Sequence, residues 1–365
     1  MARNSGGFDP KLVKRVLVVK LRHHGDVLLT TPVFSTLKKN IKGVQIDALV
    51  YADTRQMLEE HPAVSKVFSI DRAWKSLPIL TRTDAELRLL LELRGRAYDL
   101  LVHLTDHPRG AWLARLLGSS YSVAPSYGHR SAFWRHSFTH LFSLPKNARR
   151  HMVEWHLDSL RRIGIWPNAD EKSLVLVPGI EGEAEATQCI EAHGIKRGGF
   201  VHLHPPSRWS FKCWTEEKNA ELADRLAMNG QQVVLTAAPD ERELQFLERI
   251  LAKSKTKPIN LGGKLSLKGL AALTAQAKLF IGVDSAPMHI ASAMGTPVIA
   301  IFGPSGELEW GPWSPVAKVI ASTEHACRPC GIDGCGGGKI SECLLNLPLE
   351  RVLHAAMECL GKPDL

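Results

Sequence analysis

Short apolar runs alternate with longer amphipathic segments along almost the whole chain. Such runs are typical of buried strands, and the segments between them repeat their apolar residues at helical spacing. The predicted strands lie at residues 15–21, 45–51, 64–70, 100–104, 200–204, 233–236, 259–261, 279–283, 297–302 and 316–321. The predicted helices lie at residues 54–61, 84–98, 151–164, 215–228, 240–252, 266–276, 288–294 and 349–360, and another ends at Asn40. Strands that alternate with helices predict parallel sheets with both faces covered, as in α/β proteins.

The alternation is interrupted at residues 166–172, a polar stretch that contains a proline. Because 365 residues exceed what one ordinary core supports, we place a linker there and predict two doubly wound domains. The predicted boundaries are 1–172 for an N-terminal domain, 173–347 for a C-terminal domain and 348–365 for a closing helix. Residues 125–150 are predicted to be an irregular, aromatic and basic loop. A loop of that length favours contact with an acceptor or a membrane over a mere connection.

Net charge adds to this picture because it is unevenly distributed. Residues 1–175 contain 27 Lys and Arg against 16 Asp and Glu, a net +11. The remaining residues contain 19 against 21, a net −2, which together give the +9 of the chain. A basic half predicts an anionic partner: nucleic acid, anionic lipid or a phosphorylated glycolipid. Nucleic acid ranks lowest, because the chain has neither an RNP-type aromatic motif nor zinc-finger spacing.

No apolar run approaches the roughly 20 residues that span a bilayer, and the first residues lack the apolar region of a secretory signal. We therefore expect a cytoplasmic protein. Its seven cysteines, an odd number, then favour reduced thiols. Four of them share one glycine-rich loop: Cys327, Cys330, Cys335 and Cys343. Four thiolates can hold zinc or an iron–sulfur cluster, but this spacing matches neither a zinc ribbon nor a ferredoxin, so we expect free thiols and no metal.

The clearest candidate site follows the predicted strand at 279–283. The chain turns at Asp284-Ser285 into a helix that Gly295 ends, and the strand at 297–302 completes a βαβ unit. The carboxyl end of such a strand opens onto the usual ligand position, where the free N–H groups of the helix attract anions. His289 lies one turn into the helix, on the same side. The alternative is that Asp284 or Ser285 only caps the helix.

Two further stretches follow predicted strands. Gly25-Asp26 follows the first strand, where Gly25 permits a tight turn. Thr31-Pro32 either caps a helix that runs to Asn40, or Pro32 lies inside a helix that begins near Asp26. In the second half, Lys212 lies in the loop 205–214, where an ammonium can reach a diphosphate. The alternative is a solvated lysine between packed tryptophans.

Several common motifs are absent from the sequence. No G-x-G-x-x-G follows the first strand, and no G-x-S-x-G is present. The run Gly336-Gly337-Gly338-Lys339 is not a P-loop, because Asp333 stands at the upstream glycine position and Ile340 replaces the Ser or Thr. These observations argue against dinucleotide-dependent hydride transfer, nucleotide hydrolysis and serine hydrolase chemistry.

Together the site stretches resemble the ADP-heptose:lipopolysaccharide heptosyltransferases, glycosyltransferase family 9. The resemblance covers nearly the whole chain in order. It rests on Gly25-Asp26-Val27-Leu28 with Pro32, Pro206-Ser207 with Lys212 and Trp214, residues 282–289, and Cys327-Arg328-Pro329-Cys330. Residues 21–32 look most like the members that add the third heptose, a side branch of the inner core. Ala286 is a departure, since many members have glycine there; it narrows the room for the sugar and keeps the backbone N–H.

The resemblance implies a GT-B fold, with an acceptor-binding N-terminal and a nucleotide-sugar-binding C-terminal domain facing each other across a cleft. It implies an inverting single displacement that moves heptose from ADP-heptose to the phosphorylated inner core of lipopolysaccharide. The enzyme would work as a cytoplasmic protein peripheral to the inner face of the inner membrane. No metal or other cofactor is expected.

The resemblance also assigns roles to single residues. Asp26 would be the general base, and Lys212 would stabilise the charge on the departing ADP. Asp284 would accept hydrogen bonds from heptose hydroxyls, and His289 would donate to a phosphate. The implied donor-binding residues are Ser207, Lys212, Glu241, Asp284, Ser285, Ala286 and His289. A slip of one position would replace Glu241 by Asp240.

Three other functions are compatible with parts of the pattern. A nucleotide-sugar epimerase of the same fold would not explain the basic N-terminal half. The same donor chemistry on a protein or another polysaccharide stays open. A non-enzymatic ADP-sugar-binding domain would not need both Asp26 and Lys212.

Overall fold

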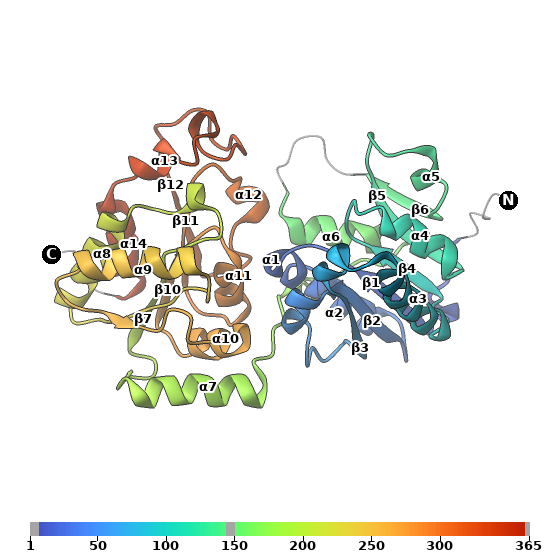
Figure 1. Cartoon of the computed structure of the whole chain (residues 1–365), viewed down its shortest axis with the longest axis horizontal. Coiled ribbons are helices and arrows are strands. Elements are labelled where there is room, and N and C mark those ends of the chain that lie inside the picture. The colour runs from blue at the N-terminus through green and yellow to red at the C-terminus, as the bar shows by residue number, and fades with distance from the viewer. Residues whose placement is uncertain (1–6, 144–149, 362–365) are drawn as a thin grey trace. The chain divides into compact units, whose positions relative to one another are not determined.

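A computed structural model describes residues 7–143 and 150–361 of the chain (Figure 1). It divides into two compact units, residues 1–175 and 176–365, which we call the N-terminal and C-terminal units. The predicted linker at 166–172 belongs to the first of them. Its 3₁₀ helix η4 (Ala169–Lys172) packs on α2, and the buried Glu171 accepts a hydrogen bond from Asn40.

The N-terminal unit is built on a parallel sheet of six strands in the order β3-β2-β1-β4-β5-β6. The strands are β1 (Arg15–Val19), β2 (Gln45–Tyr51), β3 (Lys66–Ile70), β4 (Leu100–His103), β5 (Tyr121–Ser126) and β6 (His140–Ser143). Its helices are α1 (His24–Leu28), α2 (Thr31–Asn40), α3 (Ile79–Gly95), α4 (Arg109–Leu116), α5 (Ala132–Arg135) and α6 (Met152–Arg161). Central β1 pairs with β2 and β4, which explains why its residues after Arg15 are buried.

Both faces of this sheet are covered, as expected for parallel strands. Leu17, Val19 and Leu101 pack with residues of α3, α4 and α5 in one cluster. Because alternate strand residues point to opposite faces, Val16 and Val18 face the other side. Helices α2 and α6 contact each other and the strands of this sheet.

Two local expectations for this unit need correction, and one open alternative is decided. Residues 125–150 are not one irregular loop, because α5 and β6 lie within them and β6 extends the sheet next to β5. The predicted helix at 54–61 is the 3₁₀ helix η2 (Ala52–Met57). Of the two alternatives for Thr31-Pro32, the first is confirmed: α2 runs to Asn40 with Pro32 in its first turn, and the helix that contains Asp26, α1, ends separately at Leu28.

The C-terminal unit repeats the architecture, with strand order β12-β11-β10-β7-β8-β9. The strands are β7 (Phe200–His204), β8 (Gln232–Leu235), β9 (Ile259–Asn260), β10 (Leu279–Val283), β11 (Val298–Phe302) and β12 (Ala317–Ala321). The helices are α7 (Gly179–Ala192), α8 (Glu216–Met228), α9 (Glu241–Lys253), α10 (Leu267–Ala275), α11 (Ala286–Ala293), α12 (Glu307–Trp310), α13 (Glu342–Leu345) and α14 (Leu349–Cys359). The closing helix α14 packs with α8 and β11, so it belongs to the core of this unit.

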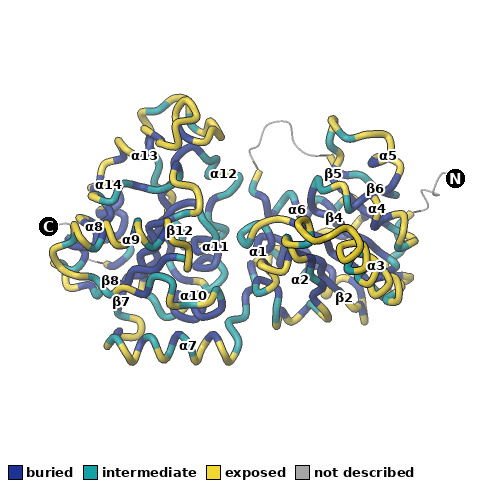
Figure 2. The backbone as a smooth tube through the Cα atoms, viewed as in Figure 1, coloured by how far each residue is buried: buried dark blue, intermediate teal, exposed yellow. Residues whose placement is uncertain are grey.

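Helix α7 has no counterpart among the predicted elements. It packs against α10 through small residues, and a side chain on Gly182 would meet the backbone of Lys268 at 2.8 Å. In both units the central strands are among the most deeply buried segments, whereas the edge strands β6, β9 and β12 are partly exposed (Figure 2). Among the described residues, no helix has the length and apolar character needed to cross a bilayer.

Candidate active site

In each sheet, consecutive strands are first added on one side of the first strand and then on its other side. The reversal lies between β1 and β4 in the N-terminal unit and between β7 and β10 in the C-terminal unit. We call these positions the N-terminal and C-terminal switch points. Ligands of open α/β sheets bind outside the carboxyl ends of the strands at such a point, because the loops diverge there. Asp26 follows β1, Lys212 follows β7 and Asp284 follows β10, so all three belong to a switch point.

At the N-terminal switch point, α1 presents Asp26 beside Lys20. Val27 and Leu28 are fully buried and hold this short helix in the core. The Asp26 side chain remains 18% exposed, and its Oδ1 lies 3.6 Å from Nζ of Lys20, whose side chain is 4% exposed. The carboxylate is therefore the accessible member of this pair.

Lys20 is held by groups from distant parts of the unit. Its Nζ lies 2.9 Å from Nε2 of His156 on α6 and donates to the carbonyl oxygen of Leu104 at 3.3 Å. The other nitrogen of His156, Nδ1, lies 3.0 Å from the carbonyl oxygen of Leu29. Nδ1–H must donate to that carbonyl, which leaves the Nε2 lone pair to accept from the ammonium.

Burial governs the protonation of both groups. It lowers the pKa of the Lys20 ammonium, and the Asp26 carboxylate opposes that effect. Burial and the neighbouring Lys20 charge together hold the pKa of His156 well below its usual range. The neutral imidazole of His156, the carbonyl of Leu104 and the carboxylate of Asp26 thus surround the Lys20 ammonium. The ammonium orients the Asp26 carboxylate, which stays partly exposed.

At the C-terminal switch point, Nζ of Lys212 donates to Oδ2 of Asp284 at 2.5 Å. The exposures are reversed here, because the Lys212 side chain is 23% exposed and the Asp284 side chain only 9%. The expected alternative of a merely solvated Lys212 is therefore wrong. The ammonium is the accessible member of this pair.

The loop that carries Lys212 is anchored on both sides. Phe211 is buried, and its carbonyl accepts from the hydroxyl of Ser341 at 2.6 Å. Trp214 is also buried, and its indole N–H donates to the carbonyl of Leu347 at 3.3 Å. These contacts fix the 3₁₀ turn η5 (Ser210–Lys212).

Helix α11 begins directly after Asp284. Ser285 is its N-cap residue, but the hydroxyl donates back to the carbonyl of Val283 at 3.3 Å and does not cap the helix. The first turn, which starts at Ala286, therefore receives no side-chain cap. The free N–H groups and the helix dipole favour an anion at this position. His289 lies one turn further on and is buried.

Ser207 and Asp240 line a pocket of about 380 Å³ beside the Lys212 loop. Asp240 is the N-cap of α9 and accepts from the backbone of Arg242 and Glu243. Glu241 is exposed, bonds to Gln245 and is not among the residues that line this pocket. Asp240, the one-residue alternative to Glu241, therefore lines the same pocket as Ser207. The role of Glu241 stays a prediction.

Comparison with known proteins identifies the family. The family model described as glycosyltransferase family 9 (heptosyltransferase) matches residues 86–340. Lipopolysaccharide heptosyltransferase 3 of Escherichia coli is 38% identical over 296 residues, which cover 80% of this chain and 85% of that protein. The chain belongs to glycosyltransferase family 9.

Further members of the family resemble it over similar lengths. Lipopolysaccharide heptosyltransferase 1 of Pseudomonas aeruginosa is 28% identical over 322 residues, 87% of this chain and 86% of that protein. The solved family 9 glycosyltransferase of Veillonella parvula superposes with a TM-score of 0.81 at 23% identity, covering 95% of this chain and 97% of that one. The structure of E. coli heptosyltransferase WaaC with ADP gives 0.74 at 22% identity, with 94% and 99% covered. The expected GT-B fold and the expected enzyme class, a glycosyltransferase, are both confirmed.

The four-cysteine loop of this family 9 chain has no ligand geometry. Cys327, Cys330 and Cys335 are exposed, whereas Cys343 is buried, which raises the pKa of its thiol. Within the described residues, no three His, Cys, Asp or Glu side chains are arranged to hold a metal ion. The preference for free thiols stays a prediction.

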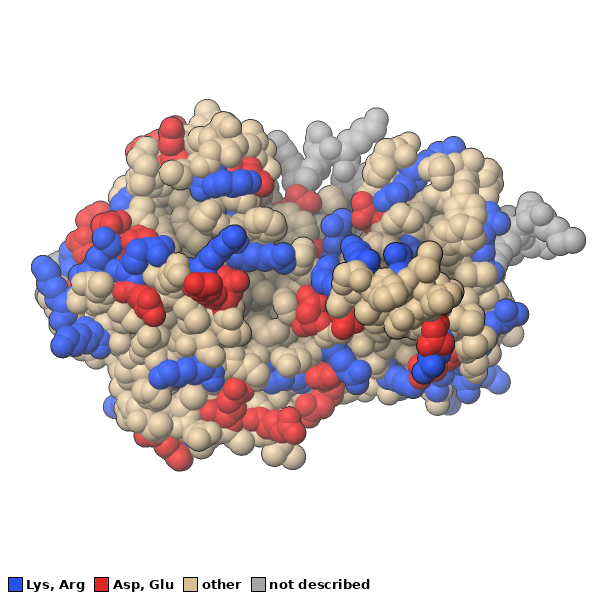
Figure 3. Space-filling view, viewed as in Figure 1, with Lys and Arg blue, Asp and Glu red and all other residues tan. Residues whose placement is uncertain are grey.

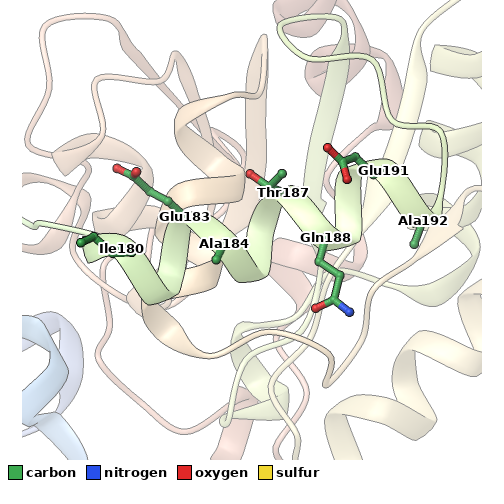
Figure 4. Close-up of a pocket in the computed structure, with 7 residues that line it drawn as sticks. All are labelled: Ile180, Glu183, Ala184, Thr187, Gln188, Glu191 and Ala192. Atoms are coloured by element: carbon green, nitrogen blue, oxygen red, sulfur yellow. The ribbon is translucent and has the colours of Figure 1, made fainter.

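An open hollow of about 620 Å³ runs along α7 (Figure 4). It is lined by Ile180, Glu183, Ala184, Thr187, Gln188, Glu191 and Ala192. These side chains come from one helix and do not converge on a point, and none is a predicted site residue. We assign no part of the transferase site to it.

Sequence reasoning missed Lys20 and His156. A signal for Lys20 was available, since a lysine that ends an otherwise apolar central strand, shortly before Gly25-Asp26, has to satisfy its charge nearby. His156 gave no comparable signal. It lies on a predicted amphipathic helix, and only the fold brings it to a lysine 136 residues away.

Proposed function

We propose that this glycosyltransferase moves a heptose from ADP-heptose to the phosphorylated inner core of lipopolysaccharide, where it adds the third heptose as a side branch. The 38% identity to an E. coli lipopolysaccharide heptosyltransferase 3 supports this substrate pair. The structural observation that carries the proposal is the pairing of Lys212 with Asp284 directly before the uncapped start of α11. Such an arrangement suits a sugar attached to a diphosphate.

In this proposal the C-terminal unit binds the donor. Lys212 and the N–H groups at Ser285 and Ala286 meet the diphosphate, and His289 donates to a phosphate oxygen. Asp284 accepts hydrogen bonds from heptose hydroxyls. Ser207 and Glu241, or Asp240 in its place, contact the nucleotide.

The N-terminal unit binds the acceptor and supplies the base. The Asp26 carboxylate takes the proton of the acceptor hydroxyl as its oxygen attacks the anomeric carbon. The bond from that carbon to the β-phosphate oxygen breaks, its electron pair leaves with ADP, and the configuration inverts. Lys212 and the α11 N–H groups stabilise the charge that grows on the phosphate, which is electrostatic stabilisation of the leaving group.

The charge distribution supports the same division. The N-terminal unit carries a net +11 over residues 1–175, which suits a phosphorylated acceptor. A lipid-linked acceptor would place the enzyme at the cytoplasmic face of the inner membrane.

The test is to incubate the purified protein with ADP-heptose and core oligosaccharide that lacks the third heptose. We expect release of ADP together with a product heavier by one heptose. A parallel incubation without acceptor measures hydrolysis and epimerisation of the donor, and one with complete core measures acceptor specificity. ADP release without a glycosylated product would contradict the proposed acceptor.

A further inference from the structure

Helix α3 of the N-terminal unit exposes large apolar side chains. Leu80, Leu87 and Leu91 are 82%, 51% and 59% exposed, although leucines of a soluble helix usually face its core. Their spacing of seven and four residues places them on one side of the helix. We call these three residues the leucine stripe. Leu77 and Ile79, at the start of the helix, are also exposed.

The opposite side of α3 holds the helix to the unit. Leu93 is buried, and Leu90 packs partly against the same cluster. Glu86 accepts a hydrogen bond at 2.6 Å from Nη2 of Arg109 on α4 and forms a second bond with Nη1. The contacts of Leu93 and Glu86 therefore hold α3 with its other side toward the unit, and this orientation leaves the leucine stripe exposed.

The charged residues around the stripe are predominantly basic. Residues 72–96 contain six Lys and Arg against three Asp and Glu. Each of the three acids is already paired with a base: Asp84 with Arg88, Glu86 with Arg109, and Glu92 with Lys66. Lys75, which precedes α3, and Arg94, which lies three residues beyond Leu91 on the same side of the helix, form no ion pair with any residue that the structure describes. In Figure 3 an uncharged area lies where Figure 1 draws α3, with Lys and Arg along its upper edge.

A second exposed apolar group lies on the neighbouring helix, which the Arg109–Glu86 pair ties to α3. Trp112 on α4 is 56% exposed and lies 4.8 Å, centroid to centroid, from the ring of Phe133. The Arg115 guanidinium lies 4.6 Å above the Phe133 ring. Aromatic rings beside basic side chains are typical of surfaces at the level of lipid headgroups.

We propose that α3 attaches the N-terminal unit to an anionic phospholipid bilayer. The leucine stripe enters the boundary between headgroups and acyl chains, and Lys75 and Arg94 meet lipid phosphates, as in other amphipathic helices that lie in a membrane surface. The link to function rests on the proposed lipid-linked acceptor. The attachment itself requires only the surface described above.

A second copy of the chain fits this surface less well than a bilayer does. A two-fold interface would bring the same patch of both copies together. The basic residues beside the stripe in one chain would then face the same basic residues of the other chain, and their like charges repel. Phospholipid phosphates are complementary to the same residues.

Vesicle co-sedimentation tests the proposal. The full chain is mixed with phosphatidylcholine vesicles that contain or lack phosphatidylglycerol, at low and high salt. We expect binding that requires phosphatidylglycerol and decreases with salt. The variant Leu80→Ser/Leu87→Ser/Leu91→Ser should bind at least about tenfold more weakly, because three leucines no longer leave water. Failure of the wild type to bind, or unchanged binding by this variant, would overturn the proposal.

Two matched controls separate this site from general effects. The triple variant Ile180→Ser/Met228→Ser/Leu308→Ser removes side chains that are 86%, 67% and 64% exposed in the other unit, and should bind as the wild type does. Lys75→Glu/Arg94→Glu should weaken binding, whereas the equal charge change Lys196→Glu/Lys278→Glu should have a smaller effect. If the two serine variants, or the two charge-reversal variants, lost vesicle binding equally, α3 would not be the surface that binds, and the proposal would be overturned.

Two more measurements distinguish the alternatives. Sedimentation velocity of the wild type and the leucine-stripe variant tests a second copy as the occupant. A wild type that is dimeric and a leucine-stripe variant that is monomeric would overturn the proposal. Heptose transfer to a water-soluble core oligosaccharide should be equal for both proteins. Transfer that fails with the wild type contradicts the proposed function and leaves the vesicle result standing, so the two failures are distinguishable.

Discussion

The two switch points carry the same pair of residue types with opposite exposures. In the N-terminal unit, Lys20 is the buried member and Asp26 the accessible one. In the C-terminal unit, Asp284 is the buried member and Lys212 the accessible one. The pairs also differ in their support, because Lys20 has a histidine and a carbonyl as further partners.

This difference shows how one fold presents opposite charges. A buried ammonium leaves its carboxylate partner as the group that can meet a hydroxyl proton. A buried carboxylate leaves its ammonium partner as the group that can meet a phosphate. A base and an anion site are thus obtained from similar pairs, because burial decides which member a substrate reaches.

The largest effect is expected from Asp26→Asn. Turnover should fall by about 10²–10⁴-fold, the usual contribution of a general base, while donor affinity stays close to that of the wild type and thermal stability decreases because the buried Lys20 loses its counter-charge. Initial rates of ADP release, calorimetric titration with ADP and a thermal unfolding curve measure the three quantities. A fall of less than tenfold would make Asp26 a residue of the turn only.

Lys212→Ala tests the accessible cation of the other pair. Loss of a donor to the developing phosphate charge should lower turnover by roughly 10²-fold and should weaken ADP binding as well. Lys278→Ala, an exposed lysine of the same unit, is the control and should change neither quantity. If Lys212→Ala retained both its ADP dissociation constant and its turnover, Lys212 would not belong to the donor site.

Lys20→Met tests whether the buried member orients Asp26. Removing one partner of a buried ion pair destabilises a protein when the remaining charge is buried, but the Asp26 side chain is 18% exposed and can be hydrated, so the unfolding midpoint should fall only modestly. Turnover should fall by about tenfold, because a misplaced base loses its geometric advantage. The ADP dissociation constant is the internal control. Wild-type turnover in this variant would leave Lys20 with a structural role only.

Salt concentration should affect acceptor binding by the N-terminal unit more than donor binding by the C-terminal unit, and this effect is smaller than those of the substitutions above. The apparent constant for a phosphorylated acceptor should rise several-fold with salt, since exposed charges are screened over about 8 Å at physiological ionic strength. The constant for ADP-heptose should change less, because the donor site has few, partly enclosed charges. Kinetics with each substrate varied in turn measure both responses, and equal responses would remove the charge difference as an argument.

Reversing the charge of Arg130, Arg135, Arg149 and Arg150 together is a poorer version of this test. Arg130 bonds to the backbone of Asp106, Arg135 bonds to the backbone of Arg130, and Arg150 pairs with Asp158. Arg149 lies outside the described residues. Changing all four would disturb the packing of the unit as well as its charge, so salt is the cleaner variable.

The smallest effect concerns stability at acid pH, to which both units contribute. Burial lowers the pKa of His103 to about 3 in the N-terminal unit and of His204 to about 3 in the C-terminal unit. Since the unfolded chain then takes up protons first as the pH falls below about 6.5, the free energy of unfolding decreases with acidification. Each of these histidines should contribute about 2 kcal/mol of loss at pH 5.

Thermal unfolding midpoints at pH 7.5 and pH 5 measure this dependence. The variant His204→Asn should show a smaller difference between the two midpoints than the wild type does. A midpoint that is the same at both pH values would mean that these imidazoles are not held neutral in the folded protein.

Most of the fold could be predicted because its signal is local. Strands β2 and β7 have the predicted bounds, since a short, mostly apolar run marks a buried strand by itself. Helix α7 was missed because it buries small residues such as Ala186 and Gly182, which give little apolar periodicity. Strand β6 was missed because only Phe142 of its four residues is buried, and its pairing with β5 defines it.

The candidate site divides in the same way. The sequence by itself determined that Asp26, Lys212 and Asp284 follow strands, because that depends only on neighbouring residues. Only the tertiary structure decided which residues meet: Lys212 pairs with a residue 72 positions away, and Lys20 with His156 across 136. It also decided which member of each pair stays accessible. Burial is set by packing between distant segments, and no local pattern of residues records it.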